Sequence, residues 1–245
     1  MSEFDQFREE VRRNIAGLRA DTDVQALSRI WIREIARHFY AYNFTWMGRP
    51  AIQFPQDMIG VQELVWQLRP DLIIETGIAH GGSLVYSASL LHLLGGDGIV
   101  VGIDIDIRPH NRRAIEQHPM ADRIRMVEGS SVDPAVIEQV REYSRGRSSI
   151  LVLLDSNHTH EHVLAELRAY APLVTPNSYI VVFDTLIEDM PADLTQDRPW
   201  GIGNNPKTAV HAYLAEDDRF EIDRDLESKL LITVAPDGWL RRTAP

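Results

Sequence analysis

DLIIETGIAHGGSLVYSASLL, residues 71–91, is the stretch that decides the fold of this 245-residue chain. Its first part is a short apolar run that ends in polar residues at Glu75 and Gly77. Strands buried on both faces appear as such runs, and in α/β proteins a turn and a helix commonly follow. After Gly77 the sequence has further glycines, which suit a turn, and then residues that suit a helix. The segment therefore predicts one strand–turn–helix unit of a parallel sheet.

The same alternation continues to the end of the chain. Apolar runs predict buried strands at residues 71–77, 98–106, 124–130, 149–155 and 178–184. Helix-like segments are expected near residues 83–94, 110–118, 134–145, 160–171 and 206–215. Such alternation predicts a mostly parallel sheet with right-handed crossovers. Pro236-Asp237-Gly238 is a turn signal between two strand-like runs, so we expect the sheet to end in an antiparallel hairpin.

The N-terminal part has a different pattern. Residues 3–40 carry helical periodicity, whereas residues 41–58 are aromatic and proline-bearing without a clear period. We interpret residues 1–58 as an N-terminal helical and loop cap, and residues 59–245 as a Rossmann-like core. One α/β domain can use the whole length, and the hydrophobic fraction of 44% suffices for its core.

Composition restricts the partners and the compartment. The formal net charge is -11 without a basic cluster, which disfavours nucleic acid and anionic membranes as partners. The chain has no cysteine, so disulfides, thiolate metal sites and a cysteine nucleophile are excluded. No apolar run approaches the roughly 18 residues of a membrane span, and no secretory signal is recognised. A cytoplasmic protein that binds a small molecule is the expectation.

The glycine-rich turn indicates the class of cofactor. Its spacing is not G-x-G-x-x-G, so the diphosphate-binding fingerprint of NAD enzymes is missing. Asp104 ends the second predicted strand, and a carboxylate there can accept both hydroxyls of a ribose. Recognition of an adenosine without a diphosphate favours S-adenosylmethionine (SAM) over NAD.

A metal site is predicted at the ends of two consecutive strands. Asp155-Ser156-Asn157-His158 follows one strand and Asp184-Thr185 follows the next. Two carboxylates with further oxygen ligands suit magnesium. Helix capping by Asp155 and turn formation by Asp184 explain the same residues equally well.

The histidines after Asp155 allow another interpretation. His158-Thr159-His160-Glu161-His162 matches the H-x-x-E-H pattern of inverted zincins, in which both outer histidines share one helix face. The match begins three residues after a predicted strand end, where a turn is expected. We therefore expect His158 to lie outside the helix, and His160 and His162 to be surface residues of it.

Four ordered blocks of the chain resemble the cephalosporin hydroxylase family, which includes rhamnosyl O-methyltransferases of natural-product pathways. The blocks are IIETGIAHGGSLVYSASLL, VGIDIDIRPHN, LVLLDSNHTHEHVLAELRAYAPLV and RPWGIGNNPKTAV. The resemblance covers roughly residues 40–245 and is specific for the family. It implies a class I methyltransferase fold, SAM as cofactor and, as in several members, a magnesium ion.

The resemblance also implies roles for individual residues. The methionine part of SAM would be held by Glu75, Gly77, Gly81, Gly82 and Ser83. Asp104 would hold the ribose, Ser130 would lie near the adenine, and Asp155 and Asp184 would be metal ligands.

One position departs from the family pattern. Relatives often carry glutamate where this chain has Phe183, so one negative ligand is missing. Metal binding would then need Glu188 or Asp189 to fold back in its place.

These observations predict a SAM-dependent O-methyltransferase with magnesium assistance. Its acceptor would be a hydroxyl of a small natural product, either a rhamnosyl-type sugar or an antibiotic scaffold. His158 is the predicted general base beside Asp155, because a neutral imidazole accepts a proton near pH 7; an ordinary turn histidine is the alternative. Residues 200–207 and the loop around Trp46 are expected to shape the acceptor pocket. A homo-oligomer is also expected.

Two other functions remain open from the sequence. One is a metal-assisted hydroxylase or hydrolase in antibiotic biosynthesis. The other is a non-catalytic SAM-binding partner subunit, against which the retained Asp155, Asp184 and His158 argue.

Overall fold

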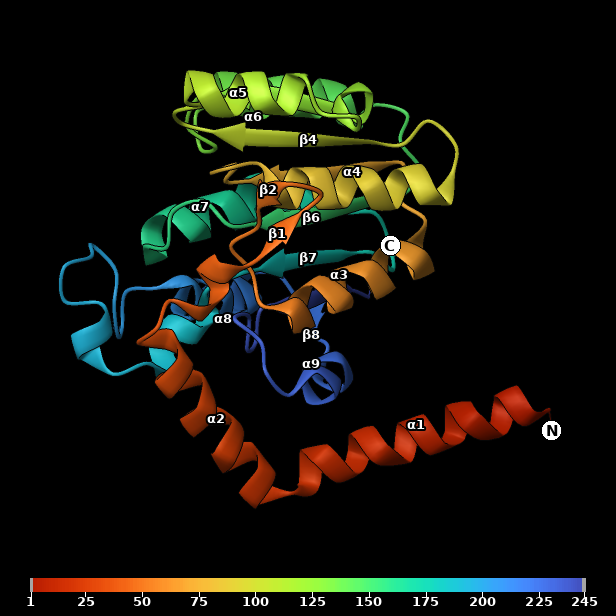
Figure 1. Ribbon diagram of the computed structural model, residues 1–245, viewed down its shortest axis with the longest axis vertical. Coiled ribbons are helices and arrows are strands. Elements are labelled where there is room, and N and C mark those ends of the chain that lie inside the picture. Colours follow the sequence, from red (N-terminus) through yellow and green to blue (C-terminus); the bar gives the residue numbers. More distant parts are fainter. Residues whose placement is uncertain (1, 244–245) are drawn as a thin grey trace.

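A seven-stranded sheet with helices on both faces forms the centre of the molecule in the computed structural model, which describes residues 2–243 (Figure 1). The strand order is β5-β4-β3-β6-β7-β9-β8. The strands are β3 (Leu72–Thr76), β4 (Ile99–Asp104), β5 (Ile124–Glu128), β6 (Ile150–Leu154), β7 (Tyr179–Val182), β8 (Phe220–Ile222) and β9 (Trp239–Arg242). The first five are parallel, and β9 is antiparallel to both β7 and β8. The predicted fold class is confirmed.

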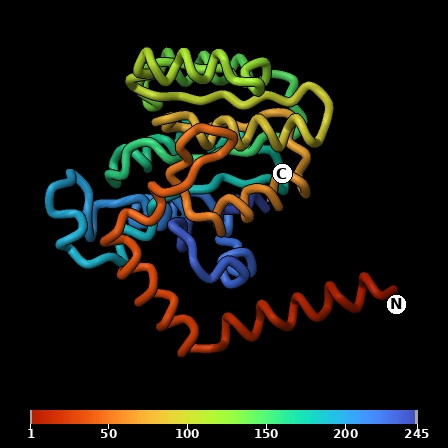
Figure 2. Tube along the Cα trace, viewed as in Figure 1, coloured from red at the N-terminus to blue at the C-terminus, as the bar shows by residue number. Residues whose placement is uncertain are grey.

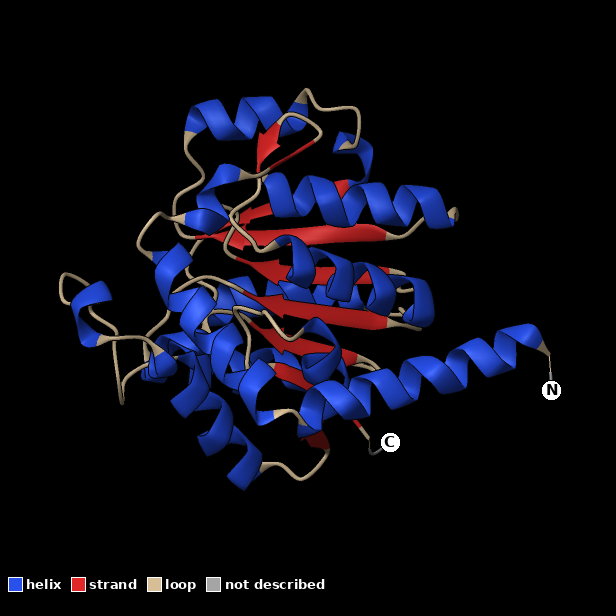
Figure 3. Ribbon diagram, turned by 60° about the horizontal axis from the view of Figure 1, so that its bottom comes forward, coloured by secondary structure: helices blue, strands red, loops and turns tan. Residues whose placement is uncertain are grey.

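Alternate residues of the central strands enter two separate apolar cores, as the period of two in a strand requires. Ile73 and Leu153 face α3 (Pro55–Leu68) and α4 (Gly82–Leu94), and α5 (Pro109–Glu116) adds Ile115 to this core. Ile74 and Val152 face the opposite core. That core is covered by α6 (Pro134–Ser144), α7 (His160–Tyr170) and α8 (Pro206–Glu216). Figure 3 shows helices on both faces of the sheet.

The N-terminal segment is more regular than predicted. Helices α1 (Glu3–Ala20) and α2 (Thr22–Ala36) confirm the expected periodicity. The expected loop instead contains a single 3-10 turn, η1 (Tyr40–Asn43), and a hairpin of β1 (Thr45–Trp46) and β2 (Arg49–Pro50). Figure 2 shows the chain passing from α2 through this hairpin into α3.

Helix α3 was not predicted, and it crosses residue 58, where the sequence analysis divided cap from core. Pro55 stands in its first turn, where a missing N–H costs nothing, and Val61, Leu64 and Val65 are buried. The aromatic and proline content before residue 59 had concealed this pattern. That residues 1–245 form one domain stays a prediction.

The C-terminal antiparallel pair is confirmed, but its connection differs from a tight hairpin. Between β8 and β9 lies α9 (Arg224–Leu230), whose N-cap Asp223 accepts hydrogen bonds from the N–H groups of Asp225 and Leu226. The turn at Pro236-Asp237-Gly238 leads only into β9, and Gly238 O accepts a bond from Val182 N. The sequence analysis did not predict this helix, which lies where a direct strand–turn–strand connection was expected. None of the helices within residues 2–243 has the length and apolarity of a membrane span.

Candidate active site

The candidate site lies where the strand order reverses, at the carboxyl ends of β3 and β6. Gly77 follows β3 with φ +90°, and a Cβ there would lie 1.9 Å from the Asp155 carbonyl oxygen. A Cβ on Gly82 would lie 2.1 Å from the Pro50 carbonyl oxygen, and one on Gly81 2.4 Å from Ile115. The glycines therefore let the β3–α4 turn pack against β6, the hairpin and α5. The protein's own packing requires them, whatever a ligand adds.

A cavity of about 200 Å³ opens above this turn. Its lining comes from the β1–β2 region, the turn and the loop after β6, and includes Pro50, Gln53, Gly77, Ile78, Ser83, Asp155 and Ser156. Glu75 is buried beneath it and accepts a hydrogen bond from Ser83 Oγ through Oε1. Glu75 Oε2 is buried without a partner, and burial raises the pKa of this carboxyl to about 7. An unpaired carboxylate oxygen fits the ammonium end of a cofactor such as SAM.

The predicted ribose and adenine residues have definite places in the fold. Asp104 Oδ2 accepts the N–H groups of Ile78 and Ala79 at 2.8 and 3.1 Å, so Asp104 fastens the turn to β4. Ser130 is half-buried after β5, and its carbonyl accepts Asp133 N. Neither residue lines the 200 Å³ cavity. Their contacts with a cofactor remain predictions.

The predicted metal ligands meet at the edge of this cavity. One ligand atom each from Asp155, His158 and Asp184 lies within 4.8 Å of the others. Asp184 has the left-handed backbone conformation, with φ 56°, and its Oδ2 is 3.2 Å from His158 Nε2. A non-glycine residue rarely adopts this conformation, and such strain is concentrated at functional sites.

The charges around Asp155 fit a bound cation. Burial, followed by repulsion from Asp184 and Glu75, raises the pKa of Asp155 well above its usual value. Among residues 2–243, no lysine or arginine forms an ion pair with any of these three acids. Two carboxylates without a balancing cation suit a divalent metal, and the imidazole of His158 lies beside them.

The position that departs from the family pattern faces away from this cluster. Phe183 is buried in the core, with its ring 6.2 Å from that of Trp239. Glu188 accepts hydrogen bonds from Gly203 N and the Asn205 amide, and Asp189 pairs with Lys207. Neither acid folds back toward the cluster, and the imidazole of His158 lies beside the two carboxylates instead.

A second cavity, of about 520 Å³, adjoins the first. Tyr42, His158 and Asp184 line both. Its other walls combine aliphatic side chains with four aromatic ones, Phe39, Tyr40, Phe54 and Trp200, and carry Arg37, Asp193 and Arg198. His158 packs edge-on against Trp200, with ring centroids 4.8 Å apart. The imidazole thus stands where a donor in the small cavity and an acceptor in the large one would meet.

Other parts of the predicted acceptor pocket lie elsewhere. Trp46 donates a 3.0 Å hydrogen bond to Ser89 Oγ and packs on Tyr86, so it contributes to the core rather than to the pocket. Lys207 lines a different cavity, beside α9.

The histidines after His158 differ from expectation. Thr159 precedes α7, so His158 lies outside the helix as predicted. His162 is not a surface residue: its side chain is 21% exposed and its Nε2 lies 3.0 Å from Ser131 Oγ and 3.5 Å from Glu166 Oε1. The reason is helical geometry, since residues 162 and 166 are one turn apart and face the strand ends.

His160 also has a hydrogen-bond partner, because its Nδ1 lies 2.8 Å from Thr208 Oγ1 on α8. His158 and His162 point to different partners, so the geometry gives the zincin pattern no support.

Two residues near the site escaped the sequence analysis. Tyr42 lines both cavities, and only the aromatic density of residues 39–46 signals it. Asp57 is fully buried in α3, and its carboxylate accepts hydrogen bonds from Thr233 Oγ1 and Val234 N. These bonds hold the loop whose Val234 carbonyl accepts a hydrogen bond from Leu186 N. Burial raises the pKa of Asp57 to about 7. No local pattern marks it, because its partners are distant in sequence.

Known proteins resemble this chain over most of its length. A family model described as rhamnosyl O-methyltransferase/CmcI matches residues 38–243. A rhamnosyl O-methyltransferase of Mycobacterium tuberculosis is 34% identical over 203 residues, covering 81% of this chain and 78% of the relative. The one of Mycobacterium leprae is 31% identical over 218 residues, covering 86% and 90%.

Solved structures share the fold. CmcI with Mg and SAM aligns with a TM-score of 0.59 at 20% identity, covering 83% of this chain and 78% of that chain. An O-methyltransferase from Bacillus cereus in complex with SAH aligns with a TM-score of 0.52 at 16% identity, covering 86% and 88%. At these identities the likeness establishes the architecture.

Proposed function

This chain belongs to the rhamnosyl O-methyltransferase/CmcI family, and on that premise we propose that it transfers a methyl group from SAM to a hydroxyl of a small glycosylated natural product. The acceptor would be a rhamnosyl-type sugar or an antibiotic scaffold. One observation carries the proposal: the two cavities meet at Tyr42, His158 and Asp184. The small cavity would hold the methionine end of the donor, and the larger cavity the acceptor.

The binding residues follow from this division. Glu75 Oε2 would accept a hydrogen bond from the ammonium group of SAM. The hydrogen bond from Ser83 Oγ to Glu75 Oε1 keeps the carboxylate in place. Asp155 and Asp184 would hold magnesium. When bound, SAM supplies an already activated methyl group, and magnesium supplies positive charge that favours the ionised form of the acceptor hydroxyl.

The remaining chemistry belongs to His158 and its neighbours. Asp184 Oδ2 lies 3.2 Å from His158 Nε2 and would accept a hydrogen bond from a proton on that nitrogen. His158 Nδ1 would then be free to accept the proton of the acceptor hydroxyl. Trp200 packs against the imidazole and fixes its orientation. Trp200 and Tyr42 would present aromatic surface to a sugar ring.

Compartment and assembly belong to the same proposal. The absence of cysteine suits the reducing cytoplasm, where we place the reaction. We assign the product to antibiotic or related biosynthesis, and the enzyme to a homo-oligomer. Metal-assisted hydroxylation or hydrolysis, and a non-catalytic subunit, receive no support from the geometry or from the relatives.

Mass spectrometry tests the transfer directly. Purified chain is incubated with rhamnosyl glycosides and SAM whose methyl group is deuterated, and the product is expected to gain one labelled methyl. Asp184→Asn should abolish this gain, whereas Asp97→Asn, an exposed residue that lines neither cavity, should retain it. Calorimetry with SAM and NAD is the companion measurement. Binding of NAD with no SAM signal would overturn the proposal.

Metal removal gives a separate prediction. Exhaustive chelation should lower methyl transfer and magnesium should restore it, because Asp155 and Asp184 lack a balancing cation. With Phe183 in place of an acid, binding should be weak and need excess magnesium. Asp155→Asn should remove the response, whereas Asp189→Asn, which is paired with Lys207 outside the cluster, should keep it. Full activity after chelation, or rescue by zinc alone, would contradict the magnesium role.

A further inference from the structure

The chain on both sides of Asp184 is hydrogen-bonded to one segment, residues 234–238, which we call the supporting segment. Asp184 has φ 56°, a conformation that non-glycine residues rarely adopt and that the surroundings must hold. Three bonds join the two stretches: Val182 N to the Gly238 carbonyl at 2.8 Å, Thr185 Oγ1 to the Pro236 carbonyl at 2.6 Å, and Leu186 N to the Val234 carbonyl at 3.1 Å. The chain is therefore fixed two residues before Asp184 and at both residues that follow it.

The two stretches approach as closely as their backbones allow. A Cβ on Gly238 would lie 2.1 Å from the Val182 carbonyl oxygen. Thr185, which follows Asp184 directly, is fully buried, and its hydroxyl donates to the Pro236 carbonyl. A buried hydroxyl without a partner is costly, so this bond restricts the direction in which the chain leaves Asp184.

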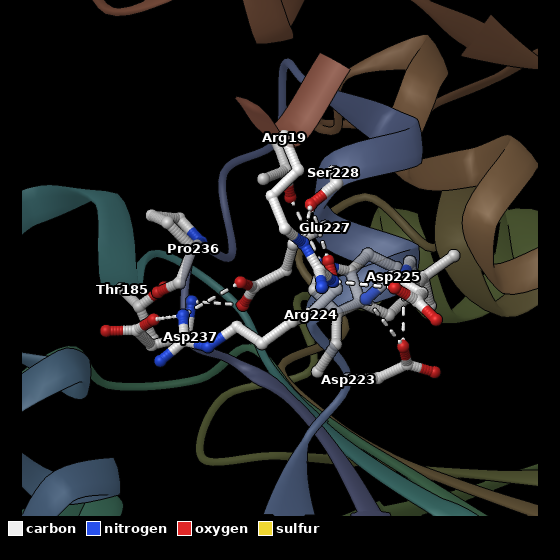
Figure 4. A network of polar contacts seen from close by, with 12 residues as sticks. Arg19, Thr185, Asp223, Arg224, Asp225, Glu227, Ser228, Pro236 and Asp237 are labelled. Carbon is white, nitrogen blue, oxygen red and sulfur yellow. Dashed lines mark hydrogen bonds and ion pairs between the residues drawn. The ribbon is translucent and has the colours of Figure 1, made fainter. Parts of the chain in front are cut away.

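Charged side chains hold Asp237, the residue after Pro236 in the supporting segment. The side chain of Asp237 is 17% exposed, and its backbone is also left-handed, with φ 67°. Its carboxylate accepts a hydrogen bond from Arg224 and lies 2.9 Å from His211 Nε2. Its N–H donates to Glu227 Oε1. Figure 4 shows Arg224 and Glu227 of α9 beside Asp237. Contacts from α8 and α9 thus fix this end of the supporting segment.

One peptide group connects these contacts with Asp184. The Pro236 carbonyl and the Asp237 N–H belong to the same planar peptide, so they point in opposite directions from one rigid unit. Glu227 accepts a hydrogen bond at one end of this unit, and Thr185 donates one at the other. Rotation of the peptide would break both bonds, so the contacts that fix Asp237 also fix Thr185.

We propose that Asp237 and Thr185 are positioning residues, which hold Asp184 where it meets Asp155 and His158. Neither positioning residue lines the cavity of about 200 Å³ or that of about 520 Å³, so each acts through Asp184. The consequence for metal binding rests on the proposed function, because it takes Asp184 as a metal ligand. The holding contacts themselves do not depend on that function.

Amide hydrogen exchange of the full chain tests the contacts without a ligand. Thr185→Val keeps the shape of the side chain and loses the hydroxyl, whereas Asp237→Asn tolerates the left-handed backbone and loses the charge. Both should speed exchange of the Leu186 N–H roughly three- to tenfold and leave that of Val101 in β4 unchanged. Thr185→Ser keeps the hydroxyl and should exchange as the parent does. Parental exchange at Leu186 in both variants, or equal acceleration at Val101, would overturn the proposal.

Binding of Mn²⁺ to the full chain, observed by electron paramagnetic resonance, tests the consequence for Asp184. Mn²⁺ takes the same carboxylate ligands as magnesium. Thr185→Val and Asp237→Asn should each raise the Mn²⁺ dissociation constant at least about threefold, because groups that orient a metal ligand govern its affinity. Thr185→Ser should restore the parental value.

Two control variants separate positioning from stability. Asp225→Asn alters an exposed acid of α9 that pairs with Arg19 (Figure 4). Thr175→Val removes a hydroxyl that accepts the N–H of Ile150, at the amino end of β6 and away from the site. Both controls should bind Mn²⁺ with parental affinity, although Thr175→Val should unfold more easily.

The outcomes distinguish this proposal from the proposed function. Parental Mn²⁺ affinity of both Thr185→Val and Asp237→Asn, or an equal loss of affinity in Thr175→Val, would overturn the positioning role. A parent chain that binds no Mn²⁺ would instead contradict the proposed magnesium site, and exchange at Leu186 would then decide the positioning role alone.

Discussion

His158 is the residue at which the two cavities meet, and its side chain is only 17% exposed. A general base contributes roughly 100- to 10,000-fold in rate. His158→Ala should therefore lower turnover by at least about 100-fold while SAM affinity is retained. His92→Ala, an exposed histidine in the last turn of α4, is the matched control for turnover and calorimetry. Near-parental turnover of His158→Ala would move the base to another residue.

His162 should matter for stability rather than for chemistry. It joins Ser131 after β5 to Ser156 after β6, above the buried Glu166. His162→Ala leaves these polar groups with fewer partners, and we expect unfolding to become easier by about 1–3 kcal/mol. Denaturant unfolding measures this, with exposed Glu161→Ala as the control. Equal stability of the two variants would show that the contacts of His162 are dispensable.

The turn between β3 and α4 depends on an acid from the neighbouring strand. Asp104 at the end of β4 accepts two N–H groups of the turn, from Ile78 and Ala79. Asp104→Ala should therefore weaken SAM binding by about 1.5–3 kcal/mol, through loss of these charge-assisted bonds and of the predicted ribose contact. Asp106→Ala, two residues on and exposed, should bind SAM normally in the same titration. Equal affinities for both variants would remove Asp104 from the cofactor site.

At the scale of the whole molecule, buried acids link stability to pH. Burial raises the pKa of Glu75 from 4.5 and that of Asp57 from 3.8 to about 7. The folded state therefore keeps protons that the unfolded chain releases. The cost of burying these charges is absent below the unfolded values, grows as pH rises, and is complete above about pH 7.

The ligand-free protein should consequently be more stable at pH 6 than at pH 8, by roughly 1–3 kcal/mol. Urea unfolding at the two pH values measures the difference. Glu75→Gln keeps the acceptor for Ser83 but cannot ionise, so it should reduce the difference, whereas exposed Glu161→Gln should not. A protein more stable at pH 8 would show that these carboxyls stay ionised when folded.

Local sequence determined most of the elements. The apolar runs ending at Thr76, Asp104 and Leu154 are strands, because a strand buried on both faces must be apolar along its whole length. Most helix boundaries agree to within two residues, since capping and period are local properties. The meeting of Asp155 and Asp184 was also predictable, because consecutive parallel strands end at the same edge.

Tertiary structure decided everything that depends on residues far apart in the chain. It turned His162 toward Ser131, it placed Phe183 against Trp239, and it made Tyr42 a shared wall of two cavities. Helix and strand periods specify which face a side chain occupies. They do not specify which distant element packs on that face, because that choice depends on how all the elements fill one core together.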